Sequence, residues 1–240
     1  MHCTNFYSPT SKMSNLISDN FKMLLVMSRF NIPLGFGESS IQQVCKANQI
    51  DLNTFLAVIN FVKAIDQKDT PPNLNYKDID LKQLIRYLKN SHLYFLDYLI
   101  PSIHKQLEQA LENSPTDTKY IINRFFNEYE KELRIHIDYE EKKVFSYIND
   151  LVEGKTPINY TIKSFLKKHK NVDQKITELK NILIKYYKGE HNYLMNSVLI
   201  NLVISEKDIY SHGQIEDSLF VPTVSYLESI LQKNKSNEES

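Results

Sequence analysis

The sequence predicts an all-α protein in which an up-down-up-down four-helix bundle follows a small helical N-terminal module. Four long segments repeat apolar residues at steps of three and four, the period of a helix buried on one face. Short connections join these segments, so consecutive helices have to run antiparallel. Only 5 of 240 residues are glycine, which argues against Gly-rich phosphate loops and against all-β folds with many tight turns.

The N-terminal module is expected over residues 1–70. Ser39 and Gln42 have the spacing of a capping box, and Asp51 is a candidate N-cap. Three short helices are expected over residues 12–29, 40–48 and 52–65. Pro71 and Pro72 then remove backbone donors and disfavour helical geometry before them, which predicts a linker over residues 71–79.

The bundle is expected over residues 80–232, with a polar tail over 233–240. Its first helix follows Asp80, with Gln83 placed to return the cap, and runs to about residue 113. Ser114 and Pro115 supply an N-cap and a first-turn proline for the second helix, which runs to about residue 152.

The third and fourth bundle helices follow the same stop and start signals. Gly154 ends the second helix, and Thr156-Pro157 begins a third that runs to about residue 188. Gly189 closes that helix. The fourth helix runs from about residue 190 to 232, with Gly213 and Pro222 as candidate kinks.

A histidine interrupts the apolar stripe of each bundle helix. These four core positions are His92, His136, His169 and His212. Glu140 follows His136, and Glu216 follows His212, at a spacing of four, which places each pair on one helix face. Both pairs can therefore reach one common centre in the core of the bundle.

Two carboxylates in an apolar core predict bound metal. A buried carboxylate costs several kcal/mol unless it is paired or binds a cation, and the stripes contain no Lys or Arg. Two cations are the natural number, with Glu140 and Glu216 as bridging ligands. Nitrogen and oxygen ligands without sulfur favour iron, manganese or zinc.

Other residues of the same types have structural interpretations. His2, His104 and His191 fall off the stripes and are expected at the surface. Tyr94, Tyr139 and Tyr147 lie near the predicted ligands, either as hydrogen-bond donors to them or as the edge of the core. Cys45 is expected to be a small buried residue, and two cysteines without a CxxC motif indicate a reducing compartment.

Four segments together resemble the hemerythrin-like (HHE) domain, and more closely its branch in the bacterial repair-of-iron-centres family. They are residues 90–92 (NSH), 133–141 (LRIHIDYEE), 168–169 (KH) and 211–222 (SHGQIEDSLFVP). The resemblance covers residues from about 80 to 225. It implies a non-heme di-iron centre, two iron ions bridged by carboxylate and by oxo when oxidised, held by His92, His136, Glu140, His169, His212 and Glu216.

The N-terminal module resembles the small helical domain of that same family, with one departure. The likeness rests on residues 29–32 (RFNI) and 40–45 (SIQQVC). The family usually carries a paired-cysteine motif after this point, whereas this chain reads Pro33-Leu34-Gly35-Phe36-Gly37. Chemistry that depends on the cysteine pair is therefore not expected here.

Three functions are compatible with these features. The first is iron–sulfur cluster repair under nitrosative or oxidative stress, with O2, NO or H2O2 as small ligands and damaged iron–sulfur proteins as partners. The second is an O2, NO or redox sensor or carrier that acts through a partner without repair activity. The third is a structural module with a fortuitous or zinc-filled site.

Charge and hydropathy predict which partners the protein lacks and where it is located. The 29 basic and 29 acidic side chains cancel, so neither nucleic acid nor a membrane surface is an expected partner. An apolar run of only five residues, 23–27, is too short for a signal-peptide core, so a cytoplasmic location is expected. The expected oligomeric state is a monomer or a homodimer.

Overall fold

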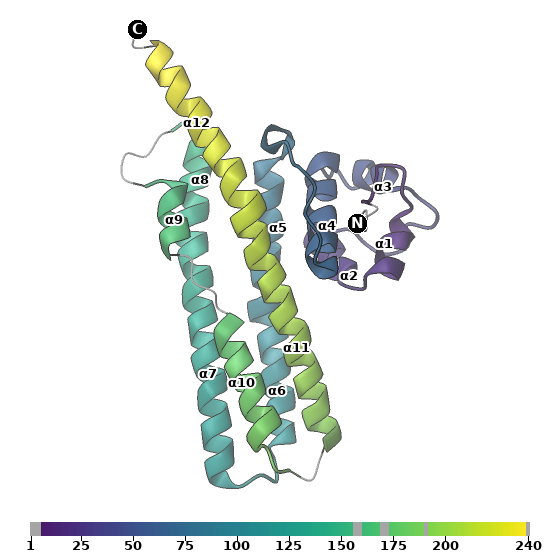
Figure 1. The fold of residues 1–240 in the computed structure, drawn as a ribbon, viewed down its shortest axis with the longest axis vertical. Coiled ribbons are helices and arrows are strands. Elements are labelled where there is room, and N and C mark those ends of the chain that lie inside the picture. Colours follow the sequence, from purple (N-terminus) through teal and green to yellow (C-terminus); the bar gives the residue numbers. More distant parts are fainter. Residues whose placement is uncertain (1–5, 156–159, 169–172, 190–191, 239–240) are drawn as a thin grey trace. The chain divides into compact units, whose positions relative to one another are not determined.

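The computed structural model describes residues 6–155, 160–168, 173–189 and 192–238, most of which are helical (Figure 1). Within these ranges there is no strand, and an isolated bridge pairs Lys12 with Ser40. The predicted all-α class is confirmed. The chain forms two compact units, one made of residues 1–91, 147–166 and 214–240 and the other of residues 92–146 and 167–213. The expected linker boundary at residues 71–79 stays a prediction.

The first unit begins with four helices, α1 (Met13–Asp19), α2 (Met23–Arg29), α3 (Ile41–Ala47) and α4 (Leu52–Gln67). The capping box of α3 pairs Ser40 with Gln43 through both of its hydrogen bonds, so the predicted pair Ser39 and Gln42 was wrong by one residue. Asp51 caps α4 as predicted, because its Oδ1 accepts a hydrogen bond from the Thr54 N–H at 2.8 Å.

The single helix predicted over residues 12–29 is wrong, because the chain breaks at Asn20. This residue is extended, with φ −155° and ψ 110°. Its side-chain oxygen accepts from the Lys22 N–H at 3.0 Å, and its amide donates to Asp66 at 3.1 Å. Asn hydrogen bonds of this kind compete with helical backbone bonds, so α1 ends before Asn20 and α2 begins at Met23.

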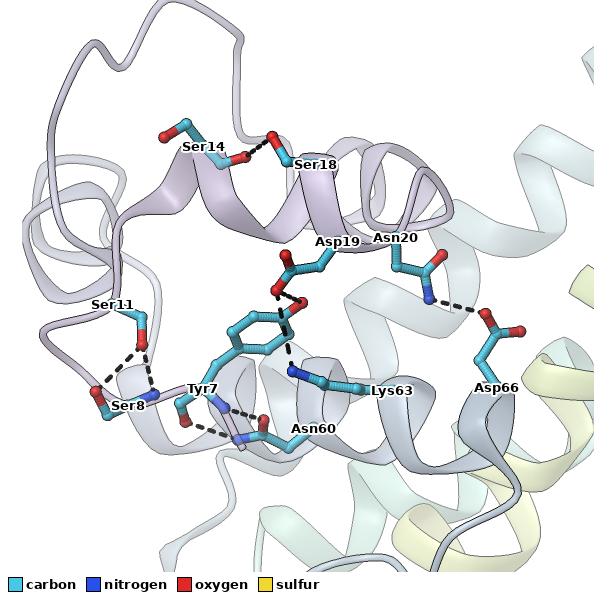
Figure 2. Close-up of polar contacts among 10 residues, drawn as sticks. All are labelled: Tyr7, Ser8, Ser11, Ser14, Ser18, Asp19, Asn20, Asn60, Lys63 and Asp66. Atoms are coloured by element: carbon cyan, nitrogen blue, oxygen red, sulfur yellow. Dashed lines mark hydrogen bonds and ion pairs between the residues drawn. The ribbon is translucent and has the colours of Figure 1, made fainter. Parts of the chain in front are cut away.

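A polar network fixes the segment before α1 against α4 (Figure 2). The Asn60 side chain accepts from the Tyr7 N–H at 2.7 Å and donates to the Tyr7 carbonyl at 3.0 Å. The Tyr7 hydroxyl donates to Asp19 at 3.0 Å, and the Lys63 ammonium lies 4.0 Å from the centre of the Tyr7 ring. The buried polar groups of Tyr7, Asn60 and Lys63 therefore all have partners in this network.

The rest of the first unit comes from later parts of the chain. Its elements are η1 (Tyr76–Asp78), most of α5 (Leu81–Leu93), α8 (Phe145–Val152) and α9 (Ile162–Lys168), η4 (Glu216–Phe220) and α12 (Val221–Glu238). Glu228 of α12 accepts hydrogen bonds from the Tyr147 hydroxyl at 2.5 Å and the Ile162 N–H at 2.8 Å. This carboxylate thereby joins α8, α9 and α12.

Gln83 does not return the cap to Asp80, contrary to prediction. Asp80 accepts from the Gln83 N–H at 3.1 Å, so half of the expected box is present. The Gln83 side chain instead accepts from the N–H of Asp51 at 2.9 Å, at the start of α4. The glutamine therefore connects two helix starts within the first unit.

The second unit is a four-helix core with one segment from each predicted bundle helix (Figure 1). Its elements are η2 (Tyr94–Leu99) with α6 (Ile100–Ala110), α7 (Thr116–Tyr139) with η3 (Glu140–Val144), α10 (Asp173–Tyr186) and most of α11 (Asn192–Ile215). Leu107, Phe126, Leu179 and Leu202 represent the four segments in one buried cluster. The predicted helical bundle is confirmed here.

Several predicted helix boundaries need correction. Pro115, not Ser114, is the N-cap of α7, and no side-chain cap bond is present there. The third helix, predicted from Pro157 to about residue 188, is described as α9 and α10, and residues 169–172 between them lie outside the described part. Gly154 has φ +79°, as a helix-ending glycine requires.

No helix in the described part of the chain is both long and apolar enough for a membrane span.

Candidate metal centre

A π-helical segment begins at or just after a predicted ligand on each of three helices. His92 lies two residues before η2, Glu140 is the first residue of η3, and Glu216 is the first residue of η4. A π segment adds one residue to a helical turn and is frequent at functional sites. Apolar spacing did not predict these segments, because one extra residue scarcely alters a pattern of threes and fours.

Four of the predicted ligands converge on a single point. One nitrogen or carboxylate oxygen each from His92, Glu140, His212 and Glu216 lies within 4.8 Å of all the others. The Nε2 atoms of His92 and His212 are 3.2 Å apart, and His92 Nε2 is 3.1 Å from Glu140 Oε2. Atoms this close on separate helices can bind one shared ion or an adjacent pair.

His136 contacts the same carboxylate from its own helix. Its Nε2 lies 3.0 Å from Glu140 Oε1, while His92 approaches the other oxygen. Glu140 thus presents one oxygen to each of two imidazoles, the arrangement expected of a bridging carboxylate. The His136 side chain is 16% exposed, more than the 1% of His92, so His136 is on the solvent side.

His169, the sixth predicted ligand, lies outside the described residues, and its role stays a prediction.

The donor set fits a cation. Glu140 and Glu216 are fully buried, at 0% exposure each. Among the described residues the buried lysine and arginine side chains are Lys63 and Arg29, which belong to α4 and α2. Carboxylates and imidazoles converge here without a buried Lys or Arg on the described part of the bundle helices, which is the composition of a binding site for a transition metal or zinc.

Two phenylalanines enclose the imidazoles. The Phe145 ring stacks on His92 with centroids 5.7 Å apart and an interplanar angle of 16°. Phe95 meets His212 edge-on, at 5.4 Å and 87°. Both phenylalanines are 1% exposed, so they remove water from these ring faces.

Sequence reasoning missed Glu141. Its Oε1 lies 3.1 Å from His92 Nδ1, on the side of the ring opposite to the centre, and its side chain is 38% exposed. The signal that could have identified it is the second glutamate directly after Glu140, together with the general need of a ligating imidazole for a partner on its other nitrogen.

The remaining histidines and tyrosines have varied outcomes. His104 is half-exposed and stacks on Phe126 at 4.9 Å, in keeping with the expected surface position, whereas His2 and His191 lie outside the described residues. The Tyr147 hydroxyl donates to Glu228 rather than to a predicted ligand, and the partly buried Tyr94 stacks on Tyr98.

Comparison with known families decides the class of the protein. The model of the hemerythrin HHE cation binding domain matches residues 83–224, more than half of the chain. The chain belongs to the hemerythrin HHE family. A search of curated proteins finds no match to this sequence. The HHE match contains all six predicted ligands, and with the buried His/Glu group it makes this a metal-binding protein.

Proposed function

We propose that this HHE protein holds two non-heme irons and acts in the cytoplasm in iron–sulfur cluster repair or in the response to nitrosative or oxidative stress. One observation carries the proposal: His92, Glu140, His212 and Glu216 meet at one buried point, and His136 contacts Glu140 from the solvent side. Two carboxylates and several imidazoles match the ligand needs of a carboxylate-bridged pair of irons.

The side chains at such a centre would have different roles. Glu140, with an imidazole near each oxygen, would bridge, and Glu216 would supply the second carboxylate. Phe95 and Phe145 keep water from His212 and His92, which strengthens electrostatic interactions inside the centre. A reduced iron pair with an open position supplies binding and redox chemistry toward O2, NO or H2O2.

The repair role is tested by recovery of a damaged enzyme. Iron-loaded full-length protein is added to an iron–sulfur enzyme whose cluster has been degraded by nitric oxide. We expect activity to return, and Glu140→Leu protein, which lacks one bridging carboxylate, to restore little. Equal recovery with and without the wild-type protein would contradict repair.

A sensor or carrier is the second candidate function. It is favoured by the absence of cysteine from segment 33–37 and by the burial of Cys45. The segment 33–37 has no cysteine, and Gly35 and Gly37 take φ values of +95° and +56° there. Cys45 is 1% exposed, and burial, with a smaller effect of Asp51, raises the pKa of its thiol to about 12. This thiol is therefore a poor replacement for the cysteine pair that is usual in the repair-of-iron-centres family.

Reversible binding separates the two candidates. A sensor predicts tight, reversible binding of NO or O2 without enzyme recovery, together with altered hydrogen exchange in the N-terminal helices. Recovery of the damaged enzyme without such a change would favour repair.

A further inference from the structure

We propose that Glu141 is a positioning residue, which holds the His92 imidazole so that its Nε2 lone pair faces the metal centre. The inference rests on the proposed metal site and goes beyond it, because Glu141 is not one of the six predicted ligands. All the residues that carry it belong to the second unit.

The His92 ring lies between consecutive carboxylates. Glu140 Oε2 is 3.1 Å from Nε2, and Glu141 Oε1 is 3.1 Å from Nδ1. In an α-helix, neighbouring side chains point about 100° apart, so one ring seldom contacts both. Here both glutamates lie in the first turn of η3, and each contacts one nitrogen of the same imidazole.

Hydrogen-bond chemistry then determines which nitrogen carries the proton. An ionised carboxylate only accepts hydrogen bonds, so a hydrogen bond with Glu141 requires a proton on Nδ1. Nε2 lies equally close to Glu140, and at that contact a bound cation would take the place of a second proton. A neutral imidazole with Nδ1–H has its lone pair on Nε2. This is the nitrogen 3.2 Å from His212 Nε2, at the convergence of the ligands. Glu141 therefore selects the ligating tautomer.

The face of the ring is restrained as well. Phe145, four residues after Glu141, stacks on His92 at an interplanar angle of 16°. Glu141 constrains one edge of the ring and Phe145 one face, so rotation of the imidazole would break both contacts. At 38% exposure the Glu141 side chain is partly hydrated, which allows substitution without leaving a buried unpaired charge.

The test compares Glu141→Leu and Glu141→Gln in the full-length protein loaded with zinc alone. Zinc release to excess chelator is measured, with thermal unfolding as the check on folding. Glu128→Leu and Glu128→Gln are the matched controls, since Glu128 lies on α7, is 41% exposed and pairs with Arg124 instead of a histidine.

We expect Glu141→Leu to release zinc faster by about 10- to 100-fold, the range typical of lost partners of ligating residues. Glu141→Gln should stay close to wild type, because its amide oxygen still accepts from Nδ1–H. In ¹⁵N-histidine spectra of the zinc-loaded protein, the His92 Nδ1–H signal, assigned with His92→Gln, should lose protection from exchange in Glu141→Leu alone.

Wild-type release rates in Glu141→Leu, or an unprotected Nδ1–H in the wild type, would overturn the positioning role while leaving the metal site intact. Equal losses in Glu141→Leu and Glu128→Leu would also overturn it, since the effect would then be general destabilisation. A wild-type protein that binds no zinc and no iron would instead contradict the proposed centre itself, and with it this inference.

Discussion

Glu140 shows how one side chain combines structural cost with function. It is fully buried at a position where an apolar residue would extend the core stripe, and His92 and His136 each lie within 3.1 Å of one of its oxygens. Burial of a carboxylate costs several kcal/mol unless a cation or hydrogen bonds offset it. The buried position of Glu140 is therefore explained better by metal binding than by packing.

Replacement of Glu140 by Leu should leave the protein folded and deplete it of metal. Apolar residues of similar volume at buried charged positions are often neutral or stabilising by about 1–4 kcal/mol. Circular dichroism and chemical denaturation check folding, and elemental analysis checks metal content, with Glu128→Leu as the surface control. An unfolded Glu140→Leu protein would contradict the assignment.

His212 and Glu216 illustrate what residue patterns can predict. Their spacing and the lack of a cation on the stripes suffice to place them together, because helical geometry is local and periodic. The second glutamate after Glu140 marks Glu141 as a candidate, but residue spacing does not assign it to His92, since that contact depends on the packing of η3 against a distant segment.

At the scale of elements, the π segments are what sequence patterns did not predict. η2, η3 and η4 adjoin the candidate ligands, while the flanking α-helices keep the expected apolar period. Helix ends were predicted to within a few residues where a side chain caps them, as at Asp51. They were wrong where Asn20 competes for backbone bonds, a choice that depends on its contact with Asp66.

Deletion of Lys142, an exposed residue of η3, should convert this segment to α-helix and weaken metal binding. A π segment holds one extra residue, so its removal keeps the flanking helices in register and moves mainly Glu140 and Glu141. We expect unchanged helix content by circular dichroism and metal content well below that of the wild type.

Deletion of Glu128 from regular α7 is the control for this experiment. It rotates the following core residues by about 100° and should unfold the protein. Full metal content after Lys142 deletion would show that η3 is not needed for the centre.

For the whole molecule, several buried acids should make folding sensitive to alkaline pH. Burial raises the pKa of Tyr129, with a smaller effect of Asp208. Burial, followed by the contact with Glu228, raises the pKa of Tyr147. Burial, with a smaller effect of Asp51, raises the pKa of the Cys45 thiol to about 12. These groups are neutral when folded and ionise at lower pH when unfolded, so their stability contribution is complete below the unfolded pKa values.

The free energy of unfolding should therefore fall as pH rises above about 9, where unfolded cysteine and then tyrosine lose protons. Fully buried Tyr129 alone gives a slope of up to about 1.4 kcal/mol per pH unit. Urea midpoints measured from pH 7 to 11 test this, with Tyr129→Phe expected to reduce the slope. A midpoint that does not change over this range would contradict it.

The iron content of the purified protein tests the central claim most directly. We predict two irons per chain, the absorption spectrum of an oxo-bridged diferric pair, and loss of both when His136 and Glu140 are replaced by Ala. Far fewer than two irons per chain after loading, or iron retained by the double variant, would contradict the di-iron assignment.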